Sequence, residues 1–395
     1  MEFMIVRSAS EIPSDKPILG FEVPGNRLDL INKCSLGNLD PQHGGTTGFV
    51  FDEPDCATCI AALDAVFCNS TNYQNAVGIC TCFDLDAAVS MVVVNLRSRG
   101  DLNRVSSETM RRLRLISEAD SFVVGVWQGV RPLPTEDELW MCYGGVTDIE
   151  TLAVPNHITG WAAQGRITLK EAVRMLEEWL LYGEGPKWSS DLDGVDYWTF
   201  EMALRILRDP NAPRFDKASA IGAMFRLARK EAMKTRRQHL RKTQEALSSG
   251  RLCVSEGVVY VDATTGPFVP ASLAYCMAPI SVIRQNDPRS GYIRYSVASF
   301  DEGRFNQPSL AAELTLMELD ARIAYSRSHV AFLLGISEHF VFDGDLQADV
   351  EYRWGDPCAS SWGGPFRMVG SPQNSDSLLT KEQVLDVVKK HINFR

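Results

Sequence analysis

Apolar residues along the first part of the chain follow the spacing of buried strands and of helices. Residues 75–82 form a short apolar run that is typical of a buried strand, and residues 87–100 and 108–119 have helical spacing. The valine-rich stretch at residues 91–94 fits a strand equally well, so a strand competes with the first of these helices. The pattern predicts an α/β arrangement in this region.

The middle of the chain has mainly helical patterns. Thr168 is a helix-capping residue ahead of an amphipathic run over residues 169–182, which Gly183 ends. Further helices are expected over residues 198–207 and 215–247, and the latter has few helix breakers. We interpret this long helix as a connector between two lobes.

From residue 251 the pattern alternates again between strands and helices. Strands are expected at residues 252–261, 279–284 and 291–299, a helix at 308–319, then a loop rich in Gly, Asp, Pro and Ser, and a final helix at 381–392 capped by Thr380. The predicted fold class is therefore α/β and two-lobed. It comprises a larger N-terminal domain with a parallel sheet (1–150), a helical region with a linker helix (151–248), and a smaller C-terminal domain (249–395).

Composition narrows the classes of function. The chain has 395 residues, 45% of them hydrophobic and 23% charged, as expected for a folded protein of two domains. A net charge of -10 argues against general binding to duplex DNA, which needs a basic face, but leaves small anionic substrates open. The first residues lack the pattern of a secretory leader, and no apolar run is long enough to span a membrane. We expect a cytoplasmic protein with free thiols, and a homo-oligomer stays open.

The clearest candidate for chemistry is the pair Asp84 and Asp86, which follows the predicted strand where a helix begins. Ligands collect outside the carboxyl ends of strands in open α/β sheets, and hard divalent cations favour carboxylate oxygen. Two such cations held close together stabilise both oxygens of a phosphoryl displacement. The plainer alternative is that Asp84 only caps the helix.

A second candidate lies in the glycine-flanked turn at residues 37–45, which carries Asp40 and His43 as metal ligands and Asn38 and Gln42 as polar neighbours. For the other candidates, the alternative to a functional role is an ordinary surface charge or turn. They are Asp120 as a further metal ligand, Arg27 for a phosphate oxygen, and the substrate-binding set Gly363, Gly364, Arg367 and Ser371, in which consecutive glycines expose N–H groups to an anion.

At these residues the chain resembles the DHH-type phosphoesterase superfamily. Asp84-Leu85-Asp86-Ala87 matches the superfamily's D-x-D-[AG] motif, and residues 118–120 match its later isolated aspartate. The helix from Phe215 resembles its linker, and residues 251–395 with 362–364 resemble its substrate domain. The chain departs from the family in having no Asp-His-His triplet. The nearest substitute, residues 40–43, precedes the D-x-D motif, and Pro365 stands where a histidine is usual.

The resemblance implies a hydrolase in which Asp84, Asp86, Asp120 and Asp40 or His43 hold one or two Mn²⁺ or Mg²⁺ ions. Its substrate would be a nucleotide, a short single-stranded oligonucleotide or another small phosphate ester, held by Gly363, Gly364 and Arg367. The alternatives are a nucleotide-sensing or assembly module without catalysis, and a nucleoside-phosphate synthetase or transferase.

Two other patterns favour structural explanations. Cys56 and Cys59 have the C-x-x-C spacing of a zinc site, but no second pair follows, so we do not expect structural zinc. The basic residues along 226–242 are more typical of a solvated helix face than of a nucleic-acid surface.

Overall fold

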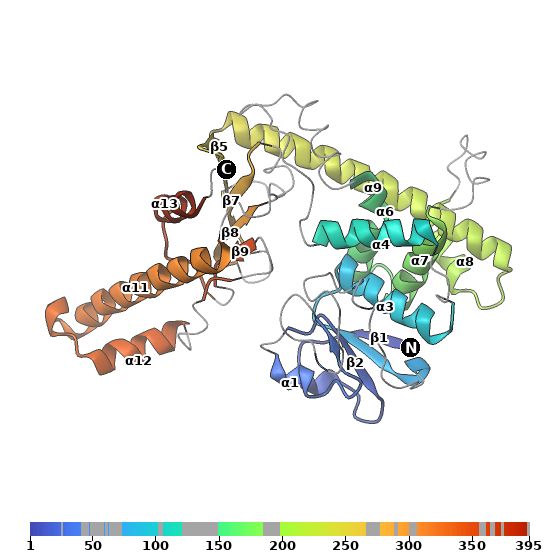
Figure 1. The fold of residues 1–395 in the computed structure, drawn as a ribbon, viewed down its shortest axis with the longest axis horizontal. Coiled ribbons are helices and arrows are strands. Elements are labelled where there is room, and N and C mark those ends of the chain that lie inside the picture. Colours follow the sequence, from blue (N-terminus) through green and yellow to red (C-terminus); the bar gives the residue numbers. More distant parts are fainter. Residues whose placement is uncertain are drawn as a thin grey trace. The chain divides into compact units, whose positions relative to one another are not determined.

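A computed structural model describes most of the chain as two compact units (Figure 1). The described residues are 1–24, 27–40, 47, 59, 62, 73–101, 106–120, 149–184, 198–265, 277–287, 291–299, 306–354, 361–363, 368–372 and 375–392. The first unit comprises Met1–Ser121 and Thr147–Arg237, and the second comprises Phe122–Val146 and Gln238–Arg395. Each unit contains a sheet covered by helices, which confirms the predicted α/β fold class.

The first unit is built on a four-stranded parallel sheet. Its strands are β1 (Glu2–Ile5), β4 (Val77–Cys80), β2 (Ile18–Phe21) and β3 (Asn38–Leu39), in that spatial order. All three pairings are parallel, as predicted for this domain. Parallel strands are buried on both faces, and every residue of β2 and β4 is buried.

Helix α3 (Leu85–Ser98) forms the centre of the first unit's core. It follows β4 directly and packs against β2, α4 (Ser107–Asp120), α6 (Ile149–Ala163) and α7 (Leu169–Tyr182). Its residues from Leu85 to Val94 are all buried. A helix enclosed on every side needs no polar face, which explains why its valine-rich sequence also resembled a strand.

The remaining helices of this unit surround that core. Thr168 and Glu171 form a capping box at the start of α7, and Gly183 with φ +76° ends it, which confirms that prediction. Helices α8 (Phe200–Arg208) and α9 (Arg214–Ser248) also confirm predicted helices. The short elements are η1 (Ala9–Glu11), α1 (Leu28–Ile31) and η2 (Tyr73–Asn75).

The second unit has a five-stranded mixed sheet. Strands β5 (Leu252–Ser255), β6 (Val258–Ala263), β7 (Ile280–Asn286), β8 (Ile293–Ser299) and β9 (Met368–Gly370) lie in sequence order, and only β6 and β7 pair in parallel. Apolar residues on one face pack against α11 (Gln307–Leu334) and α13 (Lys381–His391). A capping box at Thr380 starts α13 as predicted.

Three predictions for the second unit were wrong. Residues 252–261 form a hairpin instead of one strand, because Glu256 and Gly257 both have positive φ and turn the chain. The helix predicted to end at residue 319 continues to Leu334. The segment that we interpreted as a loop contains η4 (Glu338–Phe340) and α12 (Asp343–Trp354), which packs along α11.

In the part of the chain that the structure describes, no helix combines the length and the apolar character that a bilayer span requires.

Candidate functional site

At the carboxyl edge of the parallel sheet, three chain segments lie side by side. Gly20 of β2 pairs with Ile79 of β4 on one side and with Asn38 of β3 on the other. Two residues further along, the same register aligns Thr81, Glu22 and Asp40. At about 4.8 Å between neighbouring strands, the outer two backbones lie roughly 10 Å apart. This is the edge at which parallel α/β sheets bind ligands.

Glu22 occupies the centre of this edge in a strained backbone conformation. Its φ is +52°, in the left-handed region that residues with a side chain rarely adopt. Its N–H donates to the carbonyl of Leu39 at 2.7 Å, and its carbonyl accepts from the hydroxyl of Thr81 at 3.4 Å. Strained residues of this kind cluster at functional sites. The sequence analysis missed Glu22, although it directly follows the buried strand at residues 18–21, the same signal that identified Asp84.

Asp84 and Asp86 lie where β4 gives way to α3. Asp84 is the N-cap, and its carboxylate accepts from the N–H of Ala87 at 3.0 Å. Asp86 lies in the first turn and is only 2% exposed, and its carboxylate accepts from the N–H of Cys59 at 2.9 Å. The positive end of the helix dipole favours both negative charges. Asp84 therefore has the capping role that was the plainer alternative for it.

Asp40 directly follows β3 and is completely buried. A buried carboxylate must be balanced by hydrogen bonds or by opposite charge, since its desolvation is costly. Its neighbour Asn38 is equally buried, and its side-chain amide clamps the segment after β2. The amide oxygen accepts from the N–H of Val23 at 3.3 Å, and the amide nitrogen donates to the carbonyl of Val23 at 2.8 Å.

Arg27, the predicted phosphate ligand, has nearby partners within the protein. Its guanidinium forms a two-pronged ion pair with Asp29 at 2.9 and 3.0 Å and donates to the carbonyl of Arg7 at 2.9 Å. The hydrogen bond from Arg27 lowers the pKa of the Asp29 carboxyl. This pair is exposed, so a phosphate would have to compete with Asp29 for the guanidinium.

Several predicted ligands cannot be placed with this group. His43 and Gln42 lie outside the described residues, as do Gly364 and Arg367. Asp120 is the last residue of α4, and its side chain is not described. Among the residues that are described, no three His, Cys, Asp or Glu side chains form a group that could hold a metal ion.

In the second unit, both ends of the predicted substrate loop are held by hydrogen bonds to the sheet. Gly363 and Gly370 exchange two backbone hydrogen bonds, at 3.0 and 2.8 Å. Ser371 is 5% exposed, and its hydroxyl accepts from the N–H of Tyr295 at 3.0 Å. A side-chain atom added to Gly363 would meet open space. The two residues that would flank an anion here are thus held by β8 and β9.

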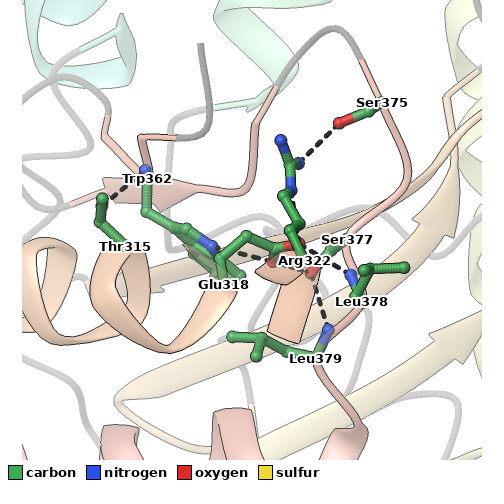
Figure 2. Close-up of polar contacts among 8 residues, drawn as sticks. All are labelled: Thr315, Glu318, Arg322, Trp362, Ser375, Ser377, Leu378 and Leu379. Carbon is green, nitrogen blue, oxygen red and sulfur yellow. Dashed lines mark hydrogen bonds and ion pairs between the residues drawn. The ribbon is translucent and has the colours of Figure 1, made fainter. Parts of the chain in front are cut away.

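A buried polar network on α11 holds the segments on either side of this loop (Figure 2). The Glu318 carboxylate accepts from the indole N–H of Trp362 at 3.3 Å and from Arg322 at 3.3 Å. It also accepts from the hydroxyl of Ser377 at 2.6 Å and the N–H of Leu378 at 2.9 Å. Glu318 and Arg322 are both 0% exposed, and burial lowers the pKa of the Arg322 guanidinium.

This network escaped the sequence analysis because a Glu and an Arg four residues apart on a helix are most often a solvated pair. The guanidinium of Arg322 also donates to the hydroxyl of Ser375 at 2.6 Å, and the N–H of Trp362 donates to the hydroxyl of Thr315 at 2.9 Å. The network therefore ties the chain before and after the loop to one helix.

Two described cysteines of the first unit, Cys59 and Cys80, are core thiols, whereas Cys82 is partly buried. Cys59 and Cys80 are completely buried, and their Sγ atoms lie 3.9 Å from the carbonyl oxygens of Leu113 and Met4. Burial is the main cause that raises the pKa of Cys80 far above its ordinary value. The Cys80 thiol is therefore held in its protonated form, whereas a metal ligand must be a thiolate.

No family model matches the chain, and neither does any curated protein. Among solved structures, the chain is similar to a pGpG-specific phosphodiesterase, PggH from Vibrio cholrae. The identity is 10%, the match covers 95% of this chain and 98% of that chain, and the TM-score is 0.33. A likeness at this level establishes neither a shared fold nor a shared activity.

Proposed function

We propose that the first unit is a metal-dependent phosphoesterase that hydrolyses a small phosphate ester, such as a nucleotide or a short oligonucleotide. One observation carries the proposal: acidic residues follow three neighbouring parallel strands at the edge of the sheet where ligands bind. These residues are Glu22 after β2, Asp40 after β3, and Asp84 with Asp86 after β4. Two of them, Asp40 and Asp86, are almost completely buried, so they are not ordinary surface carboxylates that water solvates.

The chemistry of these side chains fits a hard divalent cation. Carboxylate oxygens are the ligands that Mn²⁺ and Mg²⁺ prefer, and a bound cation would offset the desolvation of Asp40 and Asp86. Since no three described His, Cys, Asp or Glu side chains form a group that could hold a metal ion, Asp84 and Asp86 would hold the ion together with His43 or Asp120, whose side chains are not described. When bound, such an ion would lower the pKa of an attacking water and would neutralise charge on the phosphate.

The protein's own groups have distinct roles in this proposal. The N-terminal end of α3 places backbone N–H groups and a positive dipole beside the two aspartates, which favours an anionic substrate at this edge. Glu22 is only partly buried, and in this proposal its carboxylate would act as the general base that accepts a proton from water. The hydrogen bond that the Glu22 N–H donates to Leu39 and the one that its carbonyl accepts from Thr81 hold its backbone in position.

The test is a substrate screen of the Mn²⁺-loaded protein with Asp86→Asn as the critical variant. Asparagine keeps the shape and the oxygen that accepts from Cys59, so the fold should survive while the negative charge is lost. The substrates are short oligonucleotides, cyclic dinucleotides, nucleoside monophosphates and pyrophosphate. We expect hydrolysis to fall by more than about a hundredfold, since even indirect metal-site changes cost ten- to a hundredfold.

Asp101→Asn is the matched control, because Asp101 follows the other end of α3 and forms an exposed pair with Arg99. It should leave hydrolysis and Mn²⁺ affinity unchanged. Full activity of Asp86→Asn would refute the assignment. A third outcome is that the wild type binds Mn²⁺ but hydrolyses none of the substrates, and that Asp86→Asn loses Mn²⁺ binding. The first unit would then be a metal-binding module and not an enzyme.

A further inference from the structure

The second half of α11, η4 and α12 form a helical hairpin with a small core of its own. That core consists of Val330, Ala331, Val341, Leu346 and Val350, and it is separate from the cluster that joins the sheet to α11 and α13. Figure 1 shows α11 and α12 side by side, joined at one end. Ile323 and Trp354 pack against this core, and since two helices have little interior to share, other apolar residues of the hairpin are left exposed.

The connecting end of this hairpin carries an exposed apolar surface. We call it the hairpin tip and define it by Phe332 (83% exposed), Leu333 (65%), Leu334 (54%), Ile336 (38%), Phe340 (71%) and Phe342 (74%). Buried Val341 lies between two of these phenylalanines, so the backbone there turns Val341 inward and its neighbours outward. The six residues lie within eleven positions of the sequence, which makes the surface continuous along the chain.

The area of the hairpin tip matches one half of a stable protein interface. With about 200 Å² for each phenylalanine and about 150 Å² for each aliphatic side chain, the exposed fractions correspond to roughly 700 Å². The largest apolar patch on a typical monomer is about 300–600 Å². A standard interface buries about 800 Å² on each partner. The tip is therefore larger than a monomer usually tolerates and close to what a dimer needs.

The composition of the hairpin favours a second copy of this chain over a lipid surface. Glu338, Asp343 and Asp345 border the tip, and their charge would be repelled by an anionic bilayer. Two identical hairpins, by contrast, can bury their tips against each other around a two-fold axis and complete a four-helix arrangement. An apolar patch is complementary to itself and needs no opposite charge on the partner.

We propose that the hairpin tip is a self-association surface, through which two copies of this chain form a two-fold dimer. The acidic residues around the tip give the dimer a recognisable property. Because like charges from the two copies approach one another at its rim, added salt should strengthen the association by screening them. Association with a basic partner protein would be weakened by salt instead.

The test is sedimentation and light scattering of the full chain from about 1 to about 100 µM, the range over which a micromolar dimer dissociates. The wild type should approach twice its mass of 43.9 kDa. The double variant Phe332→Asp with Phe342→Asp should remain monomeric, with association weakened by roughly a hundredfold or more. Both side chains are exposed, so the circular dichroism at low temperature should not change.

Tyr182→Asp is the control, since Tyr182 is a similarly exposed aromatic residue (68%) on α7 and should not affect the dimer. A wild type that stays monomeric across the whole range overturns the proposal. So does a double variant that still dimerises, because another surface would then be responsible. The last experiment is flotation with vesicles of phosphatidylcholine and phosphatidylglycerol. If a monomeric wild type floats with the vesicles, the hairpin tip binds a lipid surface and not a second copy.

Discussion

Replacing Glu318 by alanine should destabilise the second unit more than most single substitutions in the chain. The carboxylate is 0% exposed and accepts from four donors, which belong to Arg322, Trp362, Ser377 and Leu378. Alanine removes all of these acceptor atoms at once. It also leaves the Arg322 guanidinium buried without the opposite charge that it faces on α11.

The magnitude follows from the burial of this pair. Breaking a fully buried ion pair by removing one partner costs about 3–5 kcal/mol. Each additional buried donor left unsatisfied costs about 1–3 kcal/mol, although water entering the space can offset part of this. We therefore expect a loss of at least about 3 kcal/mol, a large share of the roughly 5–15 kcal/mol that stabilises a domain.

The assay is hydrogen exchange under increasing urea, followed by mass spectrometry of peptides from β7, β8 and α13. Global unfolding of a two-unit chain does not give one transition, whereas exchange reports on each region separately. The double variant Glu318→Leu with Arg322→Met removes both charges and should regain roughly 2 kcal/mol. A loss below about 1 kcal/mol in Glu318→Ala, or a double variant no more stable than the single one, would refute this reasoning.

Two further predictions concern the first unit. Hydrogen bonding to Arg166, with smaller contributions from His157 and Trp161, lowers the pKa of Glu231 to about 2. Glu231 thus contributes stability above its unfolded pKa, and this is lost as pH falls from about 5 towards 2, so Glu231→Gln should flatten the acid limb of a stability profile. The effect is modest because the carboxylate is over a third exposed. Gly20→Ala would place a Cβ 2.2 Å from the amide oxygen of Asn38. It should destabilise the first unit by about 1–3 kcal/mol in urea unfolding, which an unchanged midpoint would contradict.

The sequence predicted long and strongly patterned elements well and short ones poorly. Helices α3, α7 and α9 were found from apolar spacing and, for α7, a capping residue. Strands β1, β2 and β3 contain only four, four and two residues, too few for a periodic pattern to emerge. The sequence also hid α6, because Pro155 lies inside it and proline usually breaks a helix.

The candidate site was predicted only where a local motif marked it. Asp84 and Asp86 were identified because they follow an apolar run, and Asp40 because it lies in a glycine-flanked turn; all three follow strands of one parallel sheet at its carboxyl edge. The order of the strands could not be predicted, since it depends on pairings between residues far apart in the sequence. For the same reason, the sequence did not reveal that Asn38 clamps Val23. The pairing of Arg27 with Asp29 is instead the surface ion pair that was the plainer alternative for Arg27.

The backbone of Glu22 gives an independent reason to regard this edge as functional. A left-handed conformation costs a residue with a side chain about 1–2 kcal/mol, whereas glycine adopts it freely. Folding alone would thus favour glycine at this position. Bonds to Leu39 and Thr81 from the strands on both sides keep the strained backbone in place. Glu256 has the same conformation in a plain hairpin turn, so it is the position of Glu22 at the carboxyl edge, beside Asp40 and Asp84, that favours a chemical role for this edge.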